Sequence, residues 1–251
     1  MTESAPARIF ADPAAACRTL AADLVELFST INASGRPAVL GLATGRTPLP
    51  FYAELIRLHR AGTLSFDKVI TFNLDEYLGL PAAHPESYHS FMRRELFDHV
   101  DIRVENVHLP DGMITPENLA AHCAAYEDAI RAAGGIDFQL LGIGRTGHIG
   151  FNEPGSPRDS RTRRIELDPI TRQDAAPSFG GLDQVPTHAI SMGCGTILEA
   201  RKIALIAWGS GKAAIVKEAL TGPISDRVSA SFLQEHGDAT FYLDAEAGSG
   251  L

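Results

Sequence analysis

Two pairs of titratable side chains lie where they could move protons. Asp75 and Glu76 follow an apolar run at residues 69–73, and His148 and Glu153 lie five residues apart in a turn rich in glycine. A carboxylate buried in a pocket can have its pKa raised and then act as a base near neutral pH. A histidine beside a carboxylate can act as a second acid or base. The two pairs therefore predict acid–base catalysis.

Both pairs also have an ordinary structural explanation. Asp75 and Glu76 could be solvated acids or the acidic start of a helix, and His148 could be a structural histidine bonded to backbone. No His and Cys spacing typical of a zinc site is present, and no GxSxG nucleophile turn. The sequence therefore predicts no metal and no serine nucleophile.

Two further turns could bind an anion such as phosphate. The first follows residues 38–42 and precedes a helical run, so its backbone N–H groups and the helix dipole would favour an anion. Its candidate residues are Thr44, Gly45, Arg46 and Thr47. Lys212 follows a glycine-rich turn after another apolar run and could reach the same anion. The alternatives are an ordinary capped turn and a surface lysine. Neither the Walker nor the GxGxxG pattern is present, which disfavours nucleotides.

Apolar runs of strand length alternate with longer amphipathic runs along the chain. The expected strands are residues 38–42, 69–73, 106–109, 138–143, 189–192, 203–208 and 239–243. The expected helices are residues 12–29, 48–61, 85–100, 116–133, 195–200, 212–220 and 230–235. This alternation predicts an α/β fold, doubly wound and Rossmann-like, with a mostly parallel sheet of about seven strands and helices on both faces. Ligands bind at the carboxyl ends of such strands, where the candidate residues lie.

No linker divides the chain, so we expect one domain over residues 1–251. Residues 156–186 are too long and too weakly periodic for an ordinary loop, which predicts a lid-like segment.

The composition excludes several classes of protein. Asp and Glu number 31 against 22 Lys and Arg, for a net charge of -9, which disfavours nucleic-acid binding. No apolar run is long enough for a membrane span, and the N-terminal residues lack the pattern of a secretion signal. The three cysteines are far apart and predict reduced thiols in a cytoplasmic protein.

Four segments resemble the family of glucosamine-6-phosphate deaminases, and the likeness spans residues 40–243. The segments are residues 42–48, 71–80, 84–92 and 147–154, with DEYLGL and GHIGFNEP as the most specific parts. The related 6-phosphogluconolactonases share the fold and a GH-containing loop. They lack the Asn-Glu-Pro ending and carry an arginine in place of Tyr77, so they are the weaker match.

The resemblance implies an enzyme of amino-sugar metabolism and N-acetylglucosamine catabolism. This hydrolase would convert glucosamine 6-phosphate and water to fructose 6-phosphate and ammonia, without a metal or organic cofactor. Asp75 would move a proton from C2 to C1 through an enolamine, and His148, oriented by Glu153, would assist ring opening. The phosphorylated amino sugar would also contact Thr44, Gly45, Arg46, Thr47, Glu76 and Lys212. Family members are monomers or hexamers, so a homo-oligomer is possible.

The sequence departs from the family pattern at several positions. Thr146 replaces an aspartate two residues before the histidine, Arg46 replaces a glycine, and no arginine stands near Pro177. We therefore expect Arg46 to supply the positive charge that would otherwise be missing from the phosphate-binding site. The basic residue that regulated family members use near Ile165 for an allosteric phosphate is missing, although Ser156 and Arg163 remain, and this argues against activation by an acetylated sugar phosphate.

Three alternatives to this activity stay open. They are a deaminase acting on another amino-sugar phosphate, a lactonase on the same fold, and a non-catalytic sugar-phosphate sensor. The third is motivated by Thr146, which removes a carboxylate from the catalytic set.

Overall fold

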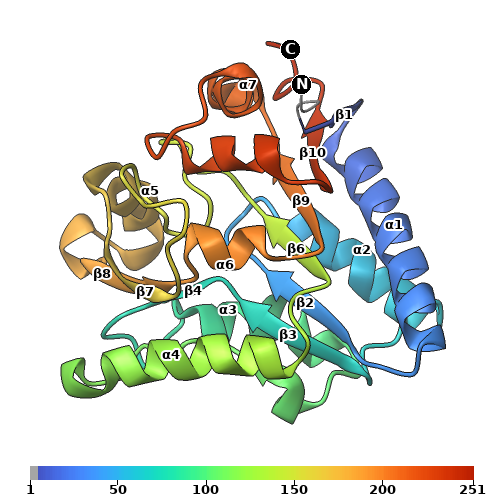
Figure 1. Cartoon of the computed structure of the whole chain (residues 1–251), viewed down its shortest axis with the longest axis horizontal. Helices are drawn as coiled ribbons and strands as arrows, with labels where there is room; N and C mark the ends of the chain where they lie inside the picture. The colour runs from blue at the N-terminus through green and yellow to red at the C-terminus, as the bar shows by residue number, and fades with distance from the viewer. Residues whose placement is uncertain (1–4) are drawn as a thin grey trace.

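A parallel sheet of seven strands runs through the middle of the molecule, as the computed structural model shows for residues 5–251 (Figure 1). In spatial order the strands are β1 (Ala7–Phe10), β10 (Ala239–Asp244), β9 (Lys202–Ala207), β6 (Phe138–Leu141), β2 (Ala38–Leu42), β3 (Val69–Asn73) and β5 (Val107–His108). All neighbouring pairs are parallel, which confirms the predicted fold class. Residues 1–4, which the predicted single domain includes, lie outside the described residues.

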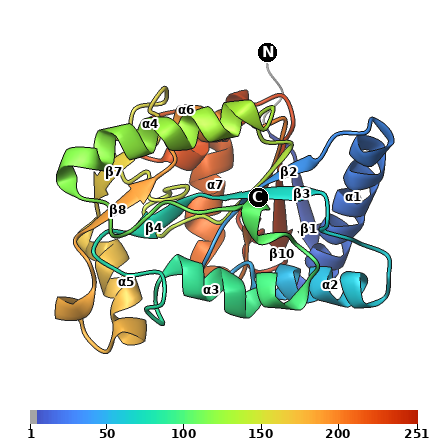
Figure 2. The same cartoon turned by 90° about the horizontal axis from the view of Figure 1, so that it is seen from below.

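Helices cover both faces of this sheet, and Figure 2 shows α4 and α6 on one side with α2 and α3 on the other. The helices are α1 (Pro13–Ala33), α2 (Leu49–Arg60), α3 (Tyr88–Glu95), α4 (Pro116–Ala132), α5 (Pro169–Phe179), α6 (Cys194–Leu198) and α7 (Ala213–Thr221). Side-chain caps fix three of the starts, since Asp12, Ser87 and Asp168 each accept a hydrogen bond from a first-turn N–H. None of the helices within residues 5–251 has the length and apolar composition to cross a membrane.

Several predicted helices are shorter or of another type. The region predicted as one helix over residues 85–100 contains α3 and then the short 3-10 helix η1 (Phe97–His99). The predicted helix at 230–235 lies within a longer 3-10 helix, η5 (Ser229–Glu235). Further 3-10 turns are η2 (Val104–Asn106), η3 (Leu182–Gln184) and η4 (Ser210–Lys212).

A second, smaller sheet lies beside the first and corrects one part of the prediction. It contains β4 (Asp75–Tyr77), β8 (His188–Ser191) and β7 (Arg163–Glu166), and both of its pairings are antiparallel. The run at 189–192, expected in the parallel sheet, therefore belongs mostly to β8. The seventh parallel strand is instead β1, whose short and largely exposed run gives little sequence signal.

The segment at residues 156–186 holds β7, α5 and η3, so it is structured along much of its length. Figure 1 shows α5 beside β7 and β8, away from the central sheet. The N-terminal turn of α5 reaches the carboxylate of Glu153, because the Thr171 hydroxyl donates to it. Its C-terminal end contacts Tyr77 through Phe179, whose ring centroid lies 5.3 Å from that of Tyr77. A lid motion of this segment stays a prediction.

A small apolar cluster packs between the second sheet and the helices α3 and α5. Its rings include Tyr77, Tyr88 and Phe151, which we call the aromatic wall. The ring centroids of Tyr77 and Tyr88 lie 4.9 Å apart, and Tyr88 stacks on Phe151 at 6.0 Å with an interplanar angle of 21°. The wall joins β4, α3 and the turn after β6, which are distant in sequence.

Candidate active site

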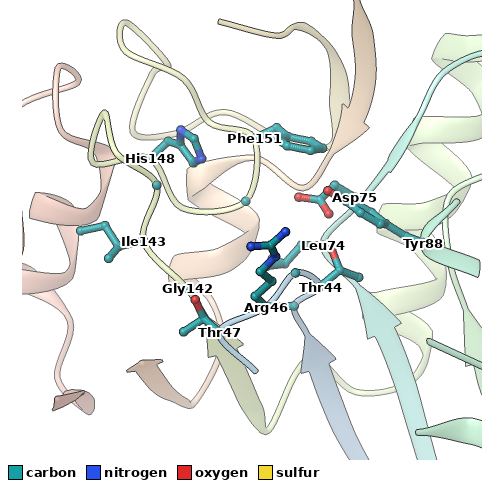
Figure 3. Close-up of a pocket in the computed structure, with 14 residues that line it drawn as sticks. Thr44, Arg46, Thr47, Leu74, Asp75, Tyr88, Gly142, Ile143, His148 and Phe151 are labelled. Carbon is teal, nitrogen blue, oxygen red and sulfur yellow. The ribbon is translucent and has the colours of Figure 1, made fainter. Parts of the chain in front are cut away.

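A pocket opens where β2, β3 and β6 end, at the edge of the sheet that parallel α/β folds use for ligands. Its lining residues are Ala43, Thr44, Gly45, Arg46, Thr47, Leu74, Asp75, Tyr88, Gly142, Ile143, Gly144, His148, Gly150 and Phe151. Figure 3 shows Asp75, Arg46 and His148 around the same space. Three separate sequence signals therefore meet in one cavity.

Asp75 presents its carboxylate to this pocket from the first position of β4. The side chain is almost completely buried, with 5% of its surface exposed. Burial, and then the charge of Glu76, raise the pKa of Asp75 well above its ordinary value. A carboxylate with a raised pKa can take and return a proton near neutral pH.

Glu76 points away from the pocket, although it is adjacent to Asp75. Successive side chains of a strand alternate between faces, so β4 places Asp75 and Tyr77 on one side and Glu76 on the other. The Glu76 carboxylate accepts from the backbone N–H groups of Tyr77, Tyr88 and His89, at 2.8, 3.0 and 3.1 Å. It is fully buried and does not line the pocket, so the predicted contact with substrate is corrected: Glu76 holds the start of α3.

His148 faces the pocket, and its ring is held from behind. Nδ1 lies 2.9 Å from Glu153 Oε2 and 2.9 Å from Thr146 Oγ1. We assign the proton to Nδ1, because a carboxylate accepts there, and this leaves Nε2 as the atom that can exchange a proton in the pocket. Thr146 also donates to Glu153 Oε2, at 3.4 Å. The Thr146 hydroxyl is thus within hydrogen-bond distance of both His148 and Glu153.

Glu153 joins the imidazole to the segment that carries α5. Its second oxygen, Oε1, accepts from Thr171 Oγ1 at 2.6 Å and from the backbone N–H of Asp168 at 3.3 Å. Burial alone would raise the pKa of Glu153. Hydrogen bonds from His148 and Thr171, with the attraction of His148, outweigh it and hold that pKa below its ordinary value. Glu153 therefore stays ionised and orients His148.

The absence of a side chain at Gly144 makes room for the ring of His148. A Cβ at this position would lie 2.1 Å from His148 Nε2 and 2.2 Å from its Cε1, which is closer than atoms can approach. We expect Gly144→Ala to rotate the imidazole out of place and to lower kcat by about 100-fold, the scale of a small misplacement of a reacting group. Steady-state kinetics and the melting temperature check this. Gly237→Ala is the control, because no atom lies within 4 Å of its Cβ position. Unchanged kcat in Gly144→Ala would contradict the expectation.

The turn at residues 44–47 leads directly into α2, as predicted for an anion site. Trp208 Nε1 donates to the carbonyl of Thr47 at 2.8 Å, and the hydroxyl of Tyr52 donates to the carbonyl of Ala43. Both ends of the turn are thus held. Arg46 is exposed and forms no ion pair among residues 5–251, while Figure 3 shows its guanidinium extending into the pocket.

Lys212 lies at the edge of the pocket rather than on its lining. Its Nζ donates to the carbonyl of Ile143, a lining residue, at 2.7 Å. Burial lowers the pKa of Lys212. Asp244 at the end of β10 fixes the preceding turn by accepting from the N–H of Gly209 at 3.0 Å. The ammonium therefore lies beside a residue that lines the pocket.

Sequence reasoning from chemical types missed two kinds of residue. Tyr88 and Phe151 line the pocket, and Thr171 orients Glu153 from a helix 18 positions away. Aromatic residues and a lone threonine give no chemical signal in a sequence. Within residues 5–251, no group of three or more His, Cys, Asp or Glu side chains could hold a metal ion.

Comparison with known proteins identifies the family. A model described as glucosamine-6-phosphate isomerases/6-phosphogluconolactonase matches residues 11–242. A glucosamine-6-phosphate deaminase of Hahella chejuensis is 52% identical over 214 residues, which are 85% of this chain and 81% of that protein. One from Arthrobacter sp. (strain FB24) is 49% identical over 232 residues, with 92% and 87% covered.

Solved structures agree with this assignment. A monomeric glucosamine-6-phosphate deaminase superimposes with a TM-score of 0.93 at 40% identity, over 98% of this chain and 100% of that one. The 6-phosphogluconolactonase of Trypanosoma brucei gives 0.79 at 21% identity, over 99% of each chain, which shows the shared fold. The chain belongs to the family of glucosamine-6-phosphate isomerases and 6-phosphogluconolactonases.

Proposed function

We propose that this protein is an enzyme that converts glucosamine 6-phosphate and water to fructose 6-phosphate and ammonia. The observation that carries the proposal is the pocket itself. A buried carboxylate with a raised pKa, Asp75, faces the same space as a histidine held by Glu153 and a turn suited to phosphate. The deaminases of Hahella and Arthrobacter, at 52% and 49% identity, support the same reaction.

The reaction needs two separate proton-transfer groups, and the pocket offers two. His148, through Nε2, would assist opening of the sugar ring, with Glu153 stabilising the positive charge that forms on the imidazole. Asp75 would then remove the proton from C2, giving an enolamine, and return it to C1, giving an imine at C2. Water adds to C2 of the imine, and the C–N bond breaks to release ammonia and leave the ketone.

The 6-phosphate would bind in the turn at residues 44–47, where Thr44, Gly45 and Thr47 provide hydroxyl and backbone donors. Lys212 would add charge from the edge of the pocket. Arg46 would extend over the phosphate, since its guanidinium is in the pocket and has no acidic partner among the residues described.

We expect Arg46→Ala to raise KM for the sugar phosphate about tenfold, the effect of losing one charge-assisted hydrogen bond. The expected change in kcat is smaller, because the phosphate is remote from the reacting carbons. Steady-state kinetics measure both constants. Arg60→Ala is the control, since Arg60 is an exposed arginine at the far end of the same helix, α2. An unchanged KM in Arg46→Ala would rule out a phosphate contact by Arg46.

A coupled ammonia assay over a panel of hexosamine phosphates tests the function directly. We expect release from glucosamine 6-phosphate to exceed release from every other amino-sugar phosphate in the panel. Hydrolysis of 6-phosphogluconolactone is measured on the same preparation. Rapid lactone hydrolysis without ammonia release would replace the proposal with the lactonase alternative, and tight binding without turnover would replace it with the sensor.

Two observations weigh against these alternatives. The deaminase structure is similar at 40% identity, whereas the lactonase structure is similar at only 21%. The sensor hypothesis depends on the absence of a carboxylate at Thr146. The Thr146 hydroxyl, however, lies within hydrogen-bond distance of the His148 imidazole, and Glu153 also contacts that ring. The acid–base pair therefore stays assembled.

We also propose that the enzyme works in the cytoplasm. Cys17, Cys123 and Cys194 are all free thiols and all buried. Free thiols are typical of proteins in a reducing compartment.

A further inference from the structure

Glu76 connects β4 to the start of α3 next to the aromatic wall, and we call its set of hydrogen bonds the anchor. Its carboxylate is completely buried, and three backbone N–H groups satisfy it. Oε1 accepts from Tyr77 and Tyr88, while Oε2 accepts from His89. Two of these donors belong to the first turn of α3, where N–H groups have no partner within the helix. Burial raises the pKa of Glu76 to about 7, and the hydrogen bonds from these three N–H groups oppose that rise.

This anchor ties α3 to the strand that carries Asp75. Glu76 is the next residue after Asp75 on β4, so any shift of the first turn of α3 relative to Asp75 would stretch these hydrogen bonds. Ser87 caps the helix by accepting from the N–H of Ser90 at 3.1 Å, but this bond is internal to α3. The hydrogen bonds that Glu76 accepts from Tyr88 and His89 thus link β4 directly to α3.

Tyr88, the first residue of α3, is the part of this helix that reaches the pocket. Its ring lines the cavity with Asp75, as Figure 3 shows, and stacks on Phe151. Its ring centroid also lies 4.9 Å from that of Tyr77, and both Tyr88 and Thr44 line the pocket. The ring therefore lies beside Asp75 on the pocket lining, where an aromatic side chain would exclude water from the carboxylate.

We infer that Tyr88 contacts the carbon chain of the substrate beside Asp75, and that Glu76 is a positioning residue that acts through Tyr88 by holding the first turn of α3. This inference rests on the proposed function for its substrate. It assigns Glu76 no contact with the sugar. The adjacent carboxylates then have separate tasks, because strand alternation turns one toward the pocket and the other toward the helix.

A double-mutant cycle tests the link between the two residues. Glu76→Gln keeps the shape of the side chain, but an amide nitrogen replaces one accepting oxygen, so at least one N–H of α3 loses its partner. We expect kcat for ammonia release to fall about tenfold or more, with a smaller change in KM, because a reacting geometry is disturbed while the phosphate turn is intact. Tyr88→Ala should lower kcat at least as much. The double variant should be no slower than Tyr88→Ala, since Glu76 acts through Tyr88.

The control separates positioning from general destabilisation. Glu127 is also a buried carboxylate, and it accepts from the N–H and hydroxyl of Thr162 and from the hydroxyl of Thr196, outside the pocket. Glu127→Gln should lower the melting temperature and leave kcat of the folded enzyme unchanged. If the losses from Glu76→Gln and Tyr88→Ala multiply, or if Glu76→Gln keeps its kcat, the inference is overturned.

Two further measurements test the role of Glu76 and Tyr88 even if Glu76→Gln does not fold or the substrate is another sugar phosphate. A crystal structure of Glu76→Gln should show the Tyr88 ring displaced, whatever the substrate turns out to be, and an unmoved ring would contradict the positioning role. If that variant does not fold, Tyr88→Phe and Tyr88→Ala are compared: the ring should sustain turnover in the first, and its loss should lower kcat in the second. Wild-type turnover of glucosamine 6-phosphate tests the proposed function itself, independently of these comparisons.

Discussion

Replacing Asp75 with asparagine is expected to lower ammonia release from glucosamine 6-phosphate by roughly two to four orders of magnitude. The asparagine keeps the size of the side chain but cannot take the proton from C2. Asp75 is buried, and its raised pKa fits it to exchange a proton near neutral pH. A second measurement is the transfer of deuterium from C2 of labelled glucosamine 6-phosphate to C1 of fructose 6-phosphate, which should also disappear.

The control for this variant is Asp23→Asn. Asp23 pairs with Arg8 of β1 and accepts from the hydroxyl of Tyr242 of β10, and none of these residues lines the pocket. Its replacement should leave turnover unchanged. The asparagine at position 75 should preserve the fold, because it removes a carboxylate whose charged form is disfavoured by burial. Ammonia release at the wild-type rate from Asp75→Asn would eliminate the proton-transfer mechanism.

The second large effect is expected at His148. Its replacement by asparagine removes the ring nitrogen that faces the pocket, so kcat should fall by about two orders of magnitude or more. KM should change little, because His148 lies across the pocket from the anion turn (Figure 3). Steady-state ammonia release measures both constants.

Thr146→Val provides the matched comparison for His148. It removes the hydroxyl that bonds Nδ1, while Glu153 still holds that nitrogen at 2.9 Å. We therefore expect a loss of only a few fold, the effect of one neutral hydrogen bond. If Thr146→Val is as slow as His148→Asn, the hydroxyl rather than Glu153 orients the ring. If His148→Asn retains full kcat, the histidine does not take part in ring opening.

The sequence was sufficient to predict the parallel sheet and the helices on both its faces, but not the second, antiparallel sheet or strand β1, because local patterns determine which segments become strands and helices. Continuous apolar runs such as residues 203–208 can be buried only between two layers of helices, which fixes a parallel sheet. The carboxyl ends of parallel strands share one edge, so the turn at 44–47, Asp75 and His148 could be placed together without coordinates. The prediction that residues 189–192 belong to the parallel sheet was wrong. An apolar run predicts a strand, but it does not predict which other strand it pairs with.

The amino-acid pattern alone predicts the parallel α/β sheet, the turns at its ligand-binding edge and the types of residue in those turns. The folded chain was needed to show that Asp75 faces the cavity while Glu76 faces α3, and that Thr171 of α5 reaches Glu153. The difference comes from the range of the interactions. Strand and helix patterns arise between neighbours in the chain, whereas the direction of each carboxylate depends on the pairing of β4 with β8, more than 100 residues away.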